Sequence, residues 1–294
     1  MASFFSVPKP LVAFNSKFPL KTYPPIRPTT KNPLTGPTLW IAPPKDGNLS
    51  NDVECLKWQA YLALRGVKGV QLRYDVAPEG SLDGVLPNLH VPLAESPLKN
   101  VPEVGRPDEN GELLPTHGIP GWVDAELGVD SAADPLEGYV NEAARVESRA
   151  WVSLLEGVVH AALILSQPQP SIFYSLLFPS AKPPYSDSLQ KILSPPPASL
   201  TGLCSFIPPQ GTRVNTIAIL SQYRDAISAL SERLGTDTWF LGSSEPTPLD
   251  ALAFAYLHCL LNSGDTVRIE VTRRVNLVAW EWRVRSLVRD GFVW

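Results

Sequence analysis

The chain has 294 residues, of which 44% are hydrophobic and 18% are charged, so it can bury a sizeable core as one large domain or two modest ones. The formal net charge is −4, a balance that excludes an evenly basic nucleic-acid-binding protein. The charge is uneven, because no acidic residue precedes Asp46. The 31 prolines cluster in the N-terminal arm, in 78–120 and in 168–209, and they predict long irregular connections there.

Residues 1–37 form an apolar, aromatic and basic segment interrupted by prolines. Proline removes a backbone donor and fixes φ, so a long helix is excluded here. The segment is also too apolar for a typical disordered tail. We therefore predict an extended arm that lies either on the chain's own body or on a partner or membrane surface. A mitochondrial presequence is the rival interpretation, but the prolines and the single Arg27 disagree with the arginine-rich amphipathic helix of such a signal.

The next segment predicts a strand–helix–strand unit. A short apolar strand is expected at 38–42, a helix at 52–64 capped by Asp52, and an alternating strand at 70–76. A further strand at 86–91 is entered through Pro87. The short crossover between the first two strands implies that they are parallel and connected with right-handed topology. The apolar face of the helix is expected to consist of Val53, Leu56, Ala60 and Leu64.

Residues 96–121 are rich in proline and glycine, and they predict a long loop or insertion with no clear element before Leu113. A short helix is expected near 119–127. From Pro135 the pattern is helical, and 136–165 predicts one long helix or two in line. Its expected apolar stripe consists of Tyr139, Ala143, Val146, Ala150, Leu154, Val158 and Ala161.

The C-terminal part predicts three more helices. Residues 168–209 are proline-rich around an apolar segment at 172–178, and an amphipathic helix follows at 214–234. Its expected stripe consists of Ile217, Leu220, Tyr223, Ile227, Leu230 and Leu234. The last helix is expected at 266–288, with a polar face made of Arg268, Arg273, Arg274, Arg283, Arg285 and Arg289, and an apolar side made of Val271, Val275, Val278 and Trp282. These arginines indicate either a solvated face or a site for a partner or lipid headgroups.

The helix at 248–261 has the clearest start signals in the chain. Thr247 is placed as the N-cap, Pro248 occupies the first helical position, and Asp250 can reach back to the N–H of the cap. The helix is apolar nearly all round, which predicts burial in a core. These roles are structural, so losing Thr247 or Asp250 is expected to cost about 1 kcal/mol each in folding.

Motifs that would carry chemistry are missing. The four histidines show no metal-ligand spacing, and there is no phosphate-binding glycine loop or nucleophile elbow. We therefore expect no catalytic residue, no metal and no cofactor. His160 and His258 lie in apolar helices, where a hydrogen-bonded core histidine is the simplest interpretation.

The three cysteines are Cys55, Cys204 and Cys259, and no pair is close in sequence. A reduced compartment is expected for them, and the two that fall inside apolar helical patterns are expected to be core residues. The start of the chain predicts no secretory signal. No stretch reaches the length of an apolar membrane span, so we expect none.

The predicted order of elements resembles the glutathione transferase fold. Pro87 resembles the proline that enters the third strand in that family and is held in cis, and Thr247-Pro-Leu-Asp250 resembles the family's capping box. The resemblance implies an α/β, thioredoxin-like N-terminal domain followed by an all-α C-terminal domain. We therefore predict an arm over 1–37, a thioredoxin-like domain with a Pro/Gly-rich insertion over 38–130, and a helical domain over 131–294.

The resemblance is closer to the metaxin branch of that fold. It is carried by 239–257 (WFLGSSEPTPLDALAFAYL), 54–61 (ECLKWQAY) and 273–278 (RRVNLV). The arm segment 18–24 (FPLKTYP) is similar to that of the fungal metaxin-like β-signal receptor subunit of the mitochondrial sorting and assembly machinery. On this basis Phe18, Leu20 and Tyr23 are the candidate partner-binding residues.

The resemblance implies a non-catalytic peripheral subunit on the cytosolic face of the mitochondrial outer membrane. Its partners would be a membrane-embedded β-barrel assembly subunit, a second metaxin-like subunit and the signal of a β-barrel precursor. A divergent glutathione transferase is the alternative. That activity needs a hydroxyl or thiol at the start of the first helix, where Ser50 is the only candidate and an N-capping or solvent-facing role is the expected one. The other metaxin-like subunit of the same machinery is a third hypothesis.

Overall fold

The computed structural model describes residues 36–44, 48–76, 80–92, 111–129, 136–167 and 215–292. The chain divides into two units, Met1–Thr35 and Gly36–Trp294. The candidate partner-binding residues Phe18, Leu20 and Tyr23 lie outside the described residues, as do Cys204 and the predicted apolar segment 172–178.

A four-stranded sheet forms the first part of the second unit. Its strands are β1 (Thr38–Trp40), β2 (Gln71–Arg73), β3 (Asn88–Pro92) and β4 (Gly111–Leu114), in the order β2-β1-β3-β4. β1 is parallel to β2 and antiparallel to β3, with Leu39 opposite both Leu72 and Leu89. The predicted parallel strand–helix–strand unit is thus confirmed. β4, which pairs antiparallel with β3, lies where the sequence predicted no strand.

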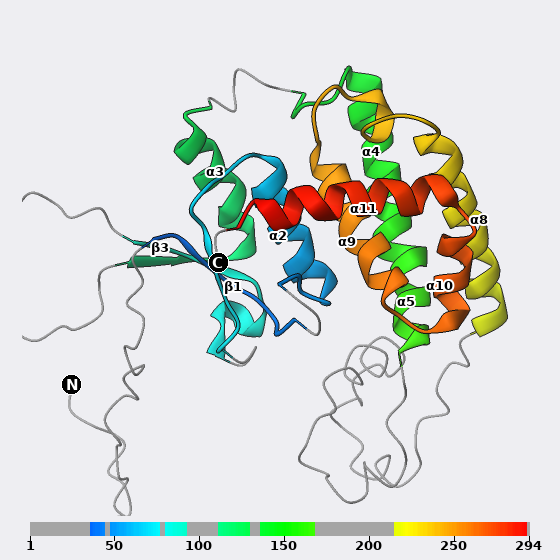
Figure 1. Ribbon diagram of the computed structural model, residues 1–294, viewed down its shortest axis with the longest axis horizontal. Coiled ribbons are helices and arrows are strands. Elements are labelled where there is room, and N and C mark those ends of the chain that lie inside the picture. The colour runs from blue at the N-terminus through cyan, green and yellow to red at the C-terminus, as the bar shows by residue number, and fades with distance from the viewer. Residues whose placement is uncertain are drawn as a thin grey trace, which may run out of the picture. The chain divides into compact units, whose positions relative to one another are not determined.

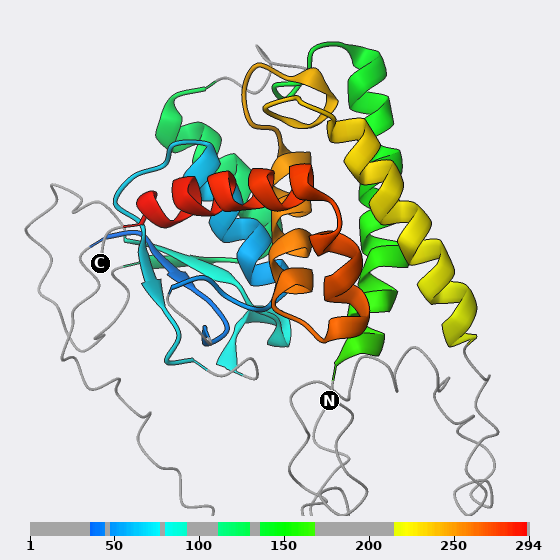
Figure 2. The same cartoon turned by 45° about the vertical axis from the view of Figure 1, so that its right-hand side comes forward.

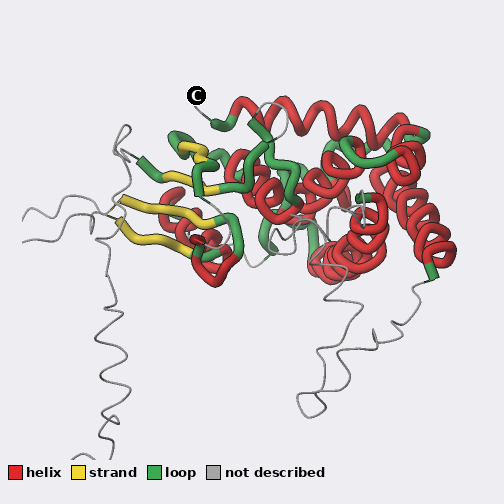
Figure 3. Tube along the Cα trace, turned by 90° about the horizontal axis from the view of Figure 1, so that it is seen from below, coloured by secondary structure: helices red, strands yellow, loops and turns green. Residues whose placement is uncertain are grey.

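Two helices accompany the sheet, α2 (Val53–Leu64) and α3 (Ile119–Leu127). The Cys55 backbone N–H donates to the Asp52 carboxylate at 2.9 Å, so Asp52 is the N-cap of α2 as predicted. The predicted apolar face is buried at Val53, Leu56 and Ala60. Figure 3 shows the strands gathered on one side of the described residues and most of the helices on the other.

The next helical run is α4 (Glu142–Leu154), a π-helical turn η4 (Leu155–Val159) and α5 (His160–Ser166). It starts later than predicted, because Gly138 adopts a left-handed backbone conformation at φ 83°, which an α-helix does not contain, and Asn141 is the N-cap of α4. Tyr139 therefore belongs to a turn and cannot set the phase of the helix. The predicted stripe is wrong by one residue: Val146 is 54% exposed.

The positions that α4, η4 and α5 do bury are Ala144, Ser148, Leu155, Val159, Ala162, Leu163 and Ile164. Among the described residues, this continuous run over Glu142–Ser166 has the length and composition of a membrane span, contrary to our expectation, with a mean hydropathy of 1.3 and 33% of that window buried. A packed core helix can have the same length and composition as a membrane span. Since Leu155 and Val159 are buried and η4 contacts α8 and α9, this run packs as part of the helical region.

The remaining elements are α8 (Thr216–Leu234), the short turn η5 (Phe240–Gly242), α9 (Pro248–Leu261), α10 (Asp265–Thr272) and α11 (Val275–Asp290). The predicted stripe of α8 is buried at Tyr223, Ile227, Leu230 and Leu234, whereas Ile217 is 81% exposed. The single predicted C-terminal helix is two helices, because Arg274 leaves the helical region at ψ 88°. The break turns α11 so that it crosses α9 and α2, which it contacts (Figures 1 and 2).

The apolar side predicted for the last helix is only partly buried: Val271, on α10, is fully buried and Val278 is half-buried, but the other two residues are exposed. Val275 and Trp282 are 78% and 69% exposed. The buried positions are instead Leu277, Trp280, Glu281, Val284 and Val288. Both sets repeat at helical spacing, so the apolar period alone selects neither.

α9 is the centre of the core, as its apolar sequence predicted. It packs along α2 and contacts α4, α5, α10 and α11. Twelve of its residues are buried, so the helix has no solvent face. Cys259 lies on it and Cys55 lies on α2, and both are buried free thiols. The Cys259 thiol donates to the backbone oxygen of Asn51 at 3.3 Å, which links the helical region to the loop before α2.

Candidate functional site

Ser50 stabilises the loop before α2 through hydrogen bonds. Its hydroxyl donates to the Ala42 oxygen at 3.3 Å and accepts from the Asp52 N–H at 3.2 Å. Its own N–H donates to the Gln59 side chain at 2.9 Å, and Ser50 is fully buried. The predicted N-cap or solvent-facing role is therefore wrong, because Asp52 is the cap. A bound thiol could reach this hydroxyl only if the loop opened.

Gln59 is the side chain that holds this loop in place, a role that no sequence pattern indicates. It is fully buried on α2 and also donates to the Asn48 oxygen at 3.0 Å. Burying an amide costs stability unless its hydrogen bonds are made. The two bonds to the loop meet that need.

Pro87 precedes β3, and the Leu86–Pro87 peptide bond is cis. The neighbouring Asn88 side chain donates to the Pro87 oxygen at 3.0 Å and accepts from the Leu82 N–H at 2.9 Å. The structure thus places Pro87 at a fixed turn beside the central strands. Asn88 supplies the hydrogen bonds that hold this turn.

Thr247 and Asp250 form the start of α9. One Asp250 carboxylate oxygen accepts from the Thr247 N–H at 2.8 Å and from its hydroxyl at 2.7 Å. The other oxygen accepts from the Phe240 N–H at 2.8 Å. Asp250 is fully buried, so it joins η5 to α9 from inside the core. Burial raises the pKa of Asp250 from 3.8 to about 6, despite the three donors that favour the charged form.

This raised pKa predicts that the contribution of Asp250 to stability depends on pH. The folded chain holds the proton more tightly than the unfolded chain, so the proton-linked part of the contribution is fully present below pH 3.8 and is lost as pH rises through about 6, while the hydrogen bonds to the carboxylate remain. The stability of wild type relative to Asp250→Asn should therefore fall by about 2 kcal/mol between roughly pH 4 and pH 7. Urea unfolding of both proteins across this range measures it. A difference that does not vary with pH would contradict the assignment.

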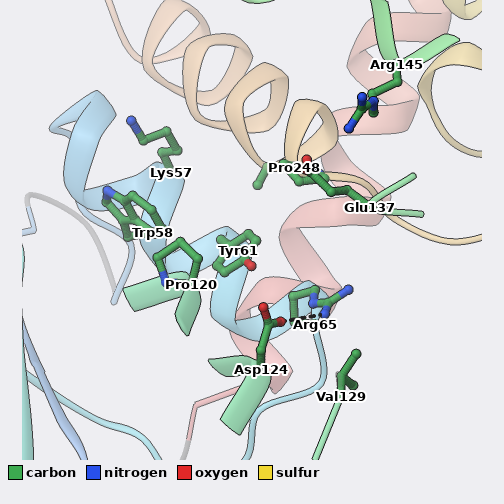
Figure 4. A pocket seen from close by; sticks show the side chains of 11 residues that line it. Lys57, Trp58, Tyr61, Arg65, Pro120, Asp124, Val129, Glu137, Arg145 and Pro248 are labelled. Atoms are coloured by element: carbon green, nitrogen blue, oxygen red, sulfur yellow. Dashed lines mark hydrogen bonds and ion pairs between the residues drawn. The ribbon is translucent and has the colours of Figure 1, made fainter. Parts of the chain in front are cut away.

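A cavity of about 550 Å³ opens where α2 and α3 meet the starts of α4 and α9. Its volume is that of sites that hold small ligands or side chains of a partner. Figure 4 shows its residues converging from these elements. They are Lys57, Trp58, Tyr61, Arg65, Pro120, Asp124, Val129, Glu137, Arg145, Pro248 and Ala251.

The wall of the cavity combines aromatic rings with charges of both signs. Trp58 and Tyr61 make an edge-to-face pair with centroids 5.5 Å apart. The Lys57 ammonium lies 5.4 Å from the Trp58 ring centroid, and Arg65 pairs with Asp124 at 3.1 Å (Figure 4). Burial raises the pKa of Tyr61, so its hydroxyl stays neutral. Such a wall suits an amphipathic ligand with an apolar body and polar groups of either charge.

The sequence did not predict that these residues line a cavity. Its α2 residues lie on the face away from the predicted apolar stripe, and that polar–aromatic face was the only signal. Its remaining lining comes from distant segments. Neither Ser50 nor Pro87 lines it, so the cavity is separate from the position where a transferase would need its hydroxyl.

A second polar cluster lies inside the helical region. The His258 ring and the fully buried Glu281 approach to 2.7 Å, and Arg285 also donates to Glu281, at 3.0 Å. Asn262 lies 3.0 Å from the other ring nitrogen of His258. Burial alone would raise the pKa of Glu281, but hydrogen bonds from His258 and Arg285 hold it below its ordinary value.

These contacts make His258 a hydrogen-bonded core histidine, as the sequence indicated. Arg285, in contrast, was predicted on a solvated face but is anchored on a buried carboxylate. Within the described ranges, no group of three or more His, Cys, Asp or Glu side chains is placed to hold a metal ion.

Comparison with known proteins bears on the fold. A family model described as "Glutathione S-transferase, C-terminal domain" matches residues 223–284, the segment that runs from α8 through α9 into α11. No curated protein sequence matches the chain.

Similar solved structures include a glutathione S-transferase from Methylobacterium radiotolerans in complex with glutathione sulfonate, at 14% identity over 87% of this chain and 93% of that chain, with a TM-score of 0.45. Glutathione transferase F7 from Populus trichocarpa matches at 11% identity over 88% and 100%, with a TM-score of 0.45. FzlA from C. crescentus matches at 14% identity over 85% and 88%, with a TM-score of 0.44.

The chain has a glutathione transferase-like fold. The thioredoxin-like sheet with its cis proline, the helical region built on a capped central helix, and the family-model match together define this class. The predicted fold class is therefore confirmed. The boundaries predicted at 37 and 130 stay predictions.

Proposed function

We propose that this chain is a non-catalytic peripheral subunit of the sorting and assembly machinery of the mitochondrial outer membrane. It acts on the cytosolic face, beside the membrane-embedded barrel subunit and a second metaxin-like subunit, and helps recognise and insert β-barrel precursors. The observation that carries the proposal is the metaxin-like order of segments. Two of these segments, 54–61 and 239–257, fall on α2 and on η5 with α9, which are the packed centre of the fold.

The loop before α2 supports the non-catalytic part of the proposal. A transferase needs a hydroxyl or thiol that reaches the glutathione sulfur. Ser50 is the candidate for that role. Its hydroxyl is buried and is already hydrogen-bonded to the Ala42 oxygen and the Asp52 N–H.

Two kinds of surface suit recognition of a precursor. β2 and β4 are the edge strands of the described sheet, and an extended segment can add to such an edge through backbone hydrogen bonds. The cavity beside Tyr61 suits a side chain of the same segment, because it offers aromatic walls and polar groups of both charges. The proposal assigns backbone pairing to an edge and side-chain selection to the cavity.

Affinity purification of the tagged full-length chain from mitochondria tests the proposal. We expect the barrel subunit to co-purify and a crosslinkable β-barrel precursor to be captured. Tyr61→Ala should lower precursor capture several-fold without releasing the barrel subunit. Ile217→Ala is the control, because Ile217 is 81% exposed on α8, is not among the cavity residues and lies outside the sheet.

Recovery of the chain without the barrel subunit, or a purely soluble cytosolic distribution, would refute the proposed function. Equal capture by Tyr61→Ala and Ile217→Ala would remove only the role of the cavity. Thermal unfolding of both variants checks that neither result comes from a misfolded protein.

A divergent glutathione transferase is the second candidate, favoured by the fold and the cis Pro87. Purified chain should then bind a glutathione column and conjugate a thiol acceptor. We expect neither. A conjugation rate that falls on Ser50→Ala, in protein that still unfolds cooperatively, would favour the enzyme instead.

A further inference from the structure

α11 presents two apolar faces, and only one of them is used by the core. The inner face packs against α9 and α2 through Leu277, Trp280 and Val284. On the outer face Val275 and Trp282 are 78% and 69% exposed. They lie seven residues apart, two turns along the same side of the helix, and the exposed Ala279 lies between them. We call Val275, Ala279, Trp282 and the exposed Arg289 the α11 outer face.

The charge around the α11 outer face is strongly one-sided. Residues 273–289 contain five arginines and a single acidic residue, Glu281, and Glu281 is fully buried. The exposed arginines of this segment are Arg273, Arg283 and Arg289. Asp290 follows at the end of the helix. The exposed Val275, Ala279 and Trp282 thus lie on a helix rich in cations, of which Arg273 also pairs with Glu270 of α10 at 3.0 Å.

Arg283 is held in place beside this face. Its guanidinium lies 5.1 Å from the Trp239 ring centroid and donates to the Thr238 oxygen. A cation that is already positioned loses less conformational entropy when an anion binds it. The positioned Arg283 guanidinium therefore prepares this surface for an anionic group next to the exposed tryptophan.

We propose that the α11 outer face docks the chain on an anionic membrane surface. Trp282 and Val275 enter the boundary between headgroups and acyl chains, where tryptophan is favoured, and the arginines contact lipid phosphates. The described face is the outward side of a single helix, which suits a planar partner better than a side chain that needs a pocket. The inference deepens the proposed peripheral location at a membrane and rests on it only for the identity of that membrane.

The test uses purified full-length chain and vesicles, with no other subunit. Co-sedimentation is measured with phosphatidylcholine vesicles and with the same vesicles containing phosphatidylserine. We expect binding to the anionic vesicles that weakens with added salt, because surface charges are screened. Each basic residue near such a surface contributes about fivefold in affinity, so Arg289→Gln should weaken binding about fivefold, and Trp282→Ala should weaken it several-fold.

Matched controls test whether vesicle binding depends on this face or on exposed apolar and basic residues in general. Ile217→Ser changes an apolar residue that is 81% exposed on α8, and Arg149→Gln removes an exposed arginine on α4. Neither should change vesicle binding. Brominated lipid should quench tryptophan fluorescence more in wild type than in Trp282→Phe, because Trp282 alone among the eight tryptophans differs between them.

Equal binding by the Trp282→Ala and Ile217→Ser variants, or quenching that does not depend on Trp282, would overturn the proposal. So would binding of wild type to polyglutamate but not to anionic vesicles, which would make the face a site for an acidic protein. Because the assay contains only chain and lipid, its failure is distinct from failure to recover the assembly complex.

Discussion

Replacing Arg285 with methionine is expected to lower the free energy of unfolding by about 3 kcal/mol. Methionine keeps most of the aliphatic volume, so the loss falls on the guanidinium. That group donates to the fully buried Glu281 carboxylate. Without it, His258 is the one close partner that the buried charge keeps among the described residues. Urea unfolding of wild type and variant measures the difference.

The double variant Glu281→Leu with Arg285→Met shows whether the cost comes from the stranded charge. Replacing a whole buried pair with apolar residues is often close to neutral, so the double variant should recover most of the loss. Arg268→Met is the surface control, because its pair with Asp265 is 49% and 74% exposed. Such an exposed pair contributes only about 0.3–0.5 kcal/mol. Equal losses for Arg285→Met and Arg268→Met would refute the role given to the buried cluster.

Replacing Asp250 with alanine is expected to cost about 3–5 kcal/mol, more than the sequence indicated. The sequence predicts only a capping role, for which about 1 kcal/mol is usual. In the fold the carboxylate also accepts from the Phe240 N–H and from the Thr247 hydroxyl. Alanine leaves these donors and the Thr247 N–H buried without an acceptor, and each unmet donor costs about 1–3 kcal/mol.

Thr247→Val is the comparison for this prediction. It removes the hydroxyl but leaves the bonds from the Thr247 and Phe240 N–H groups to Asp250 intact. We expect it to cost about 1 kcal/mol, measured in the same unfolding experiment. If Asp250→Ala cost no more than Thr247→Val, the link between η5 and α9 would have no energetic weight.

The elements predicted correctly are those specified by neighbouring residues. Asp52 before α2 and Thr247-Pro-Leu-Asp250 before α9 are local start signals, and Pro87 marks the entry to β3. A helix cap acts within one turn, so it can be read without knowing the tertiary structure. The parallel pairing of β1 and β2 followed from the single short crossover between them.

The faces of α4 and α11 could not be predicted in the same way. Each has two sets of small or apolar residues at helical spacing, and the choice between them depends on which neighbour packs there. For α4 the anchor Tyr139 belongs to the preceding turn, so the phase was shifted by one residue. For α11 the buried set includes the charged Glu281, which no hydropathy pattern favours and only its pairing with His258 and Arg285 explains.

The cavity was beyond prediction for a related reason. Tyr61, Asp124, Glu137 and Pro248 come from four separate segments, and only the packed fold brings them together. Glu137 adopts a left-handed conformation at φ 52°, which is uncommon for a residue other than glycine. Nothing in its neighbourhood in the sequence indicates that conformation.

The close contact between the end of α11 and α2 affects how the molecule unfolds. At Gly291 a side chain would lie 2.7 Å from the Ala63 Cβ atom, so the chain touches the last turn of α2 with no space between them. The same helix packs on α9. Neither the sheet region nor the helical region can therefore loosen while α11 stays in place. If α11 detaches, both regions lose their contacts with it at the same time. The two regions are therefore expected to unfold in a single cooperative transition rather than as independent domains.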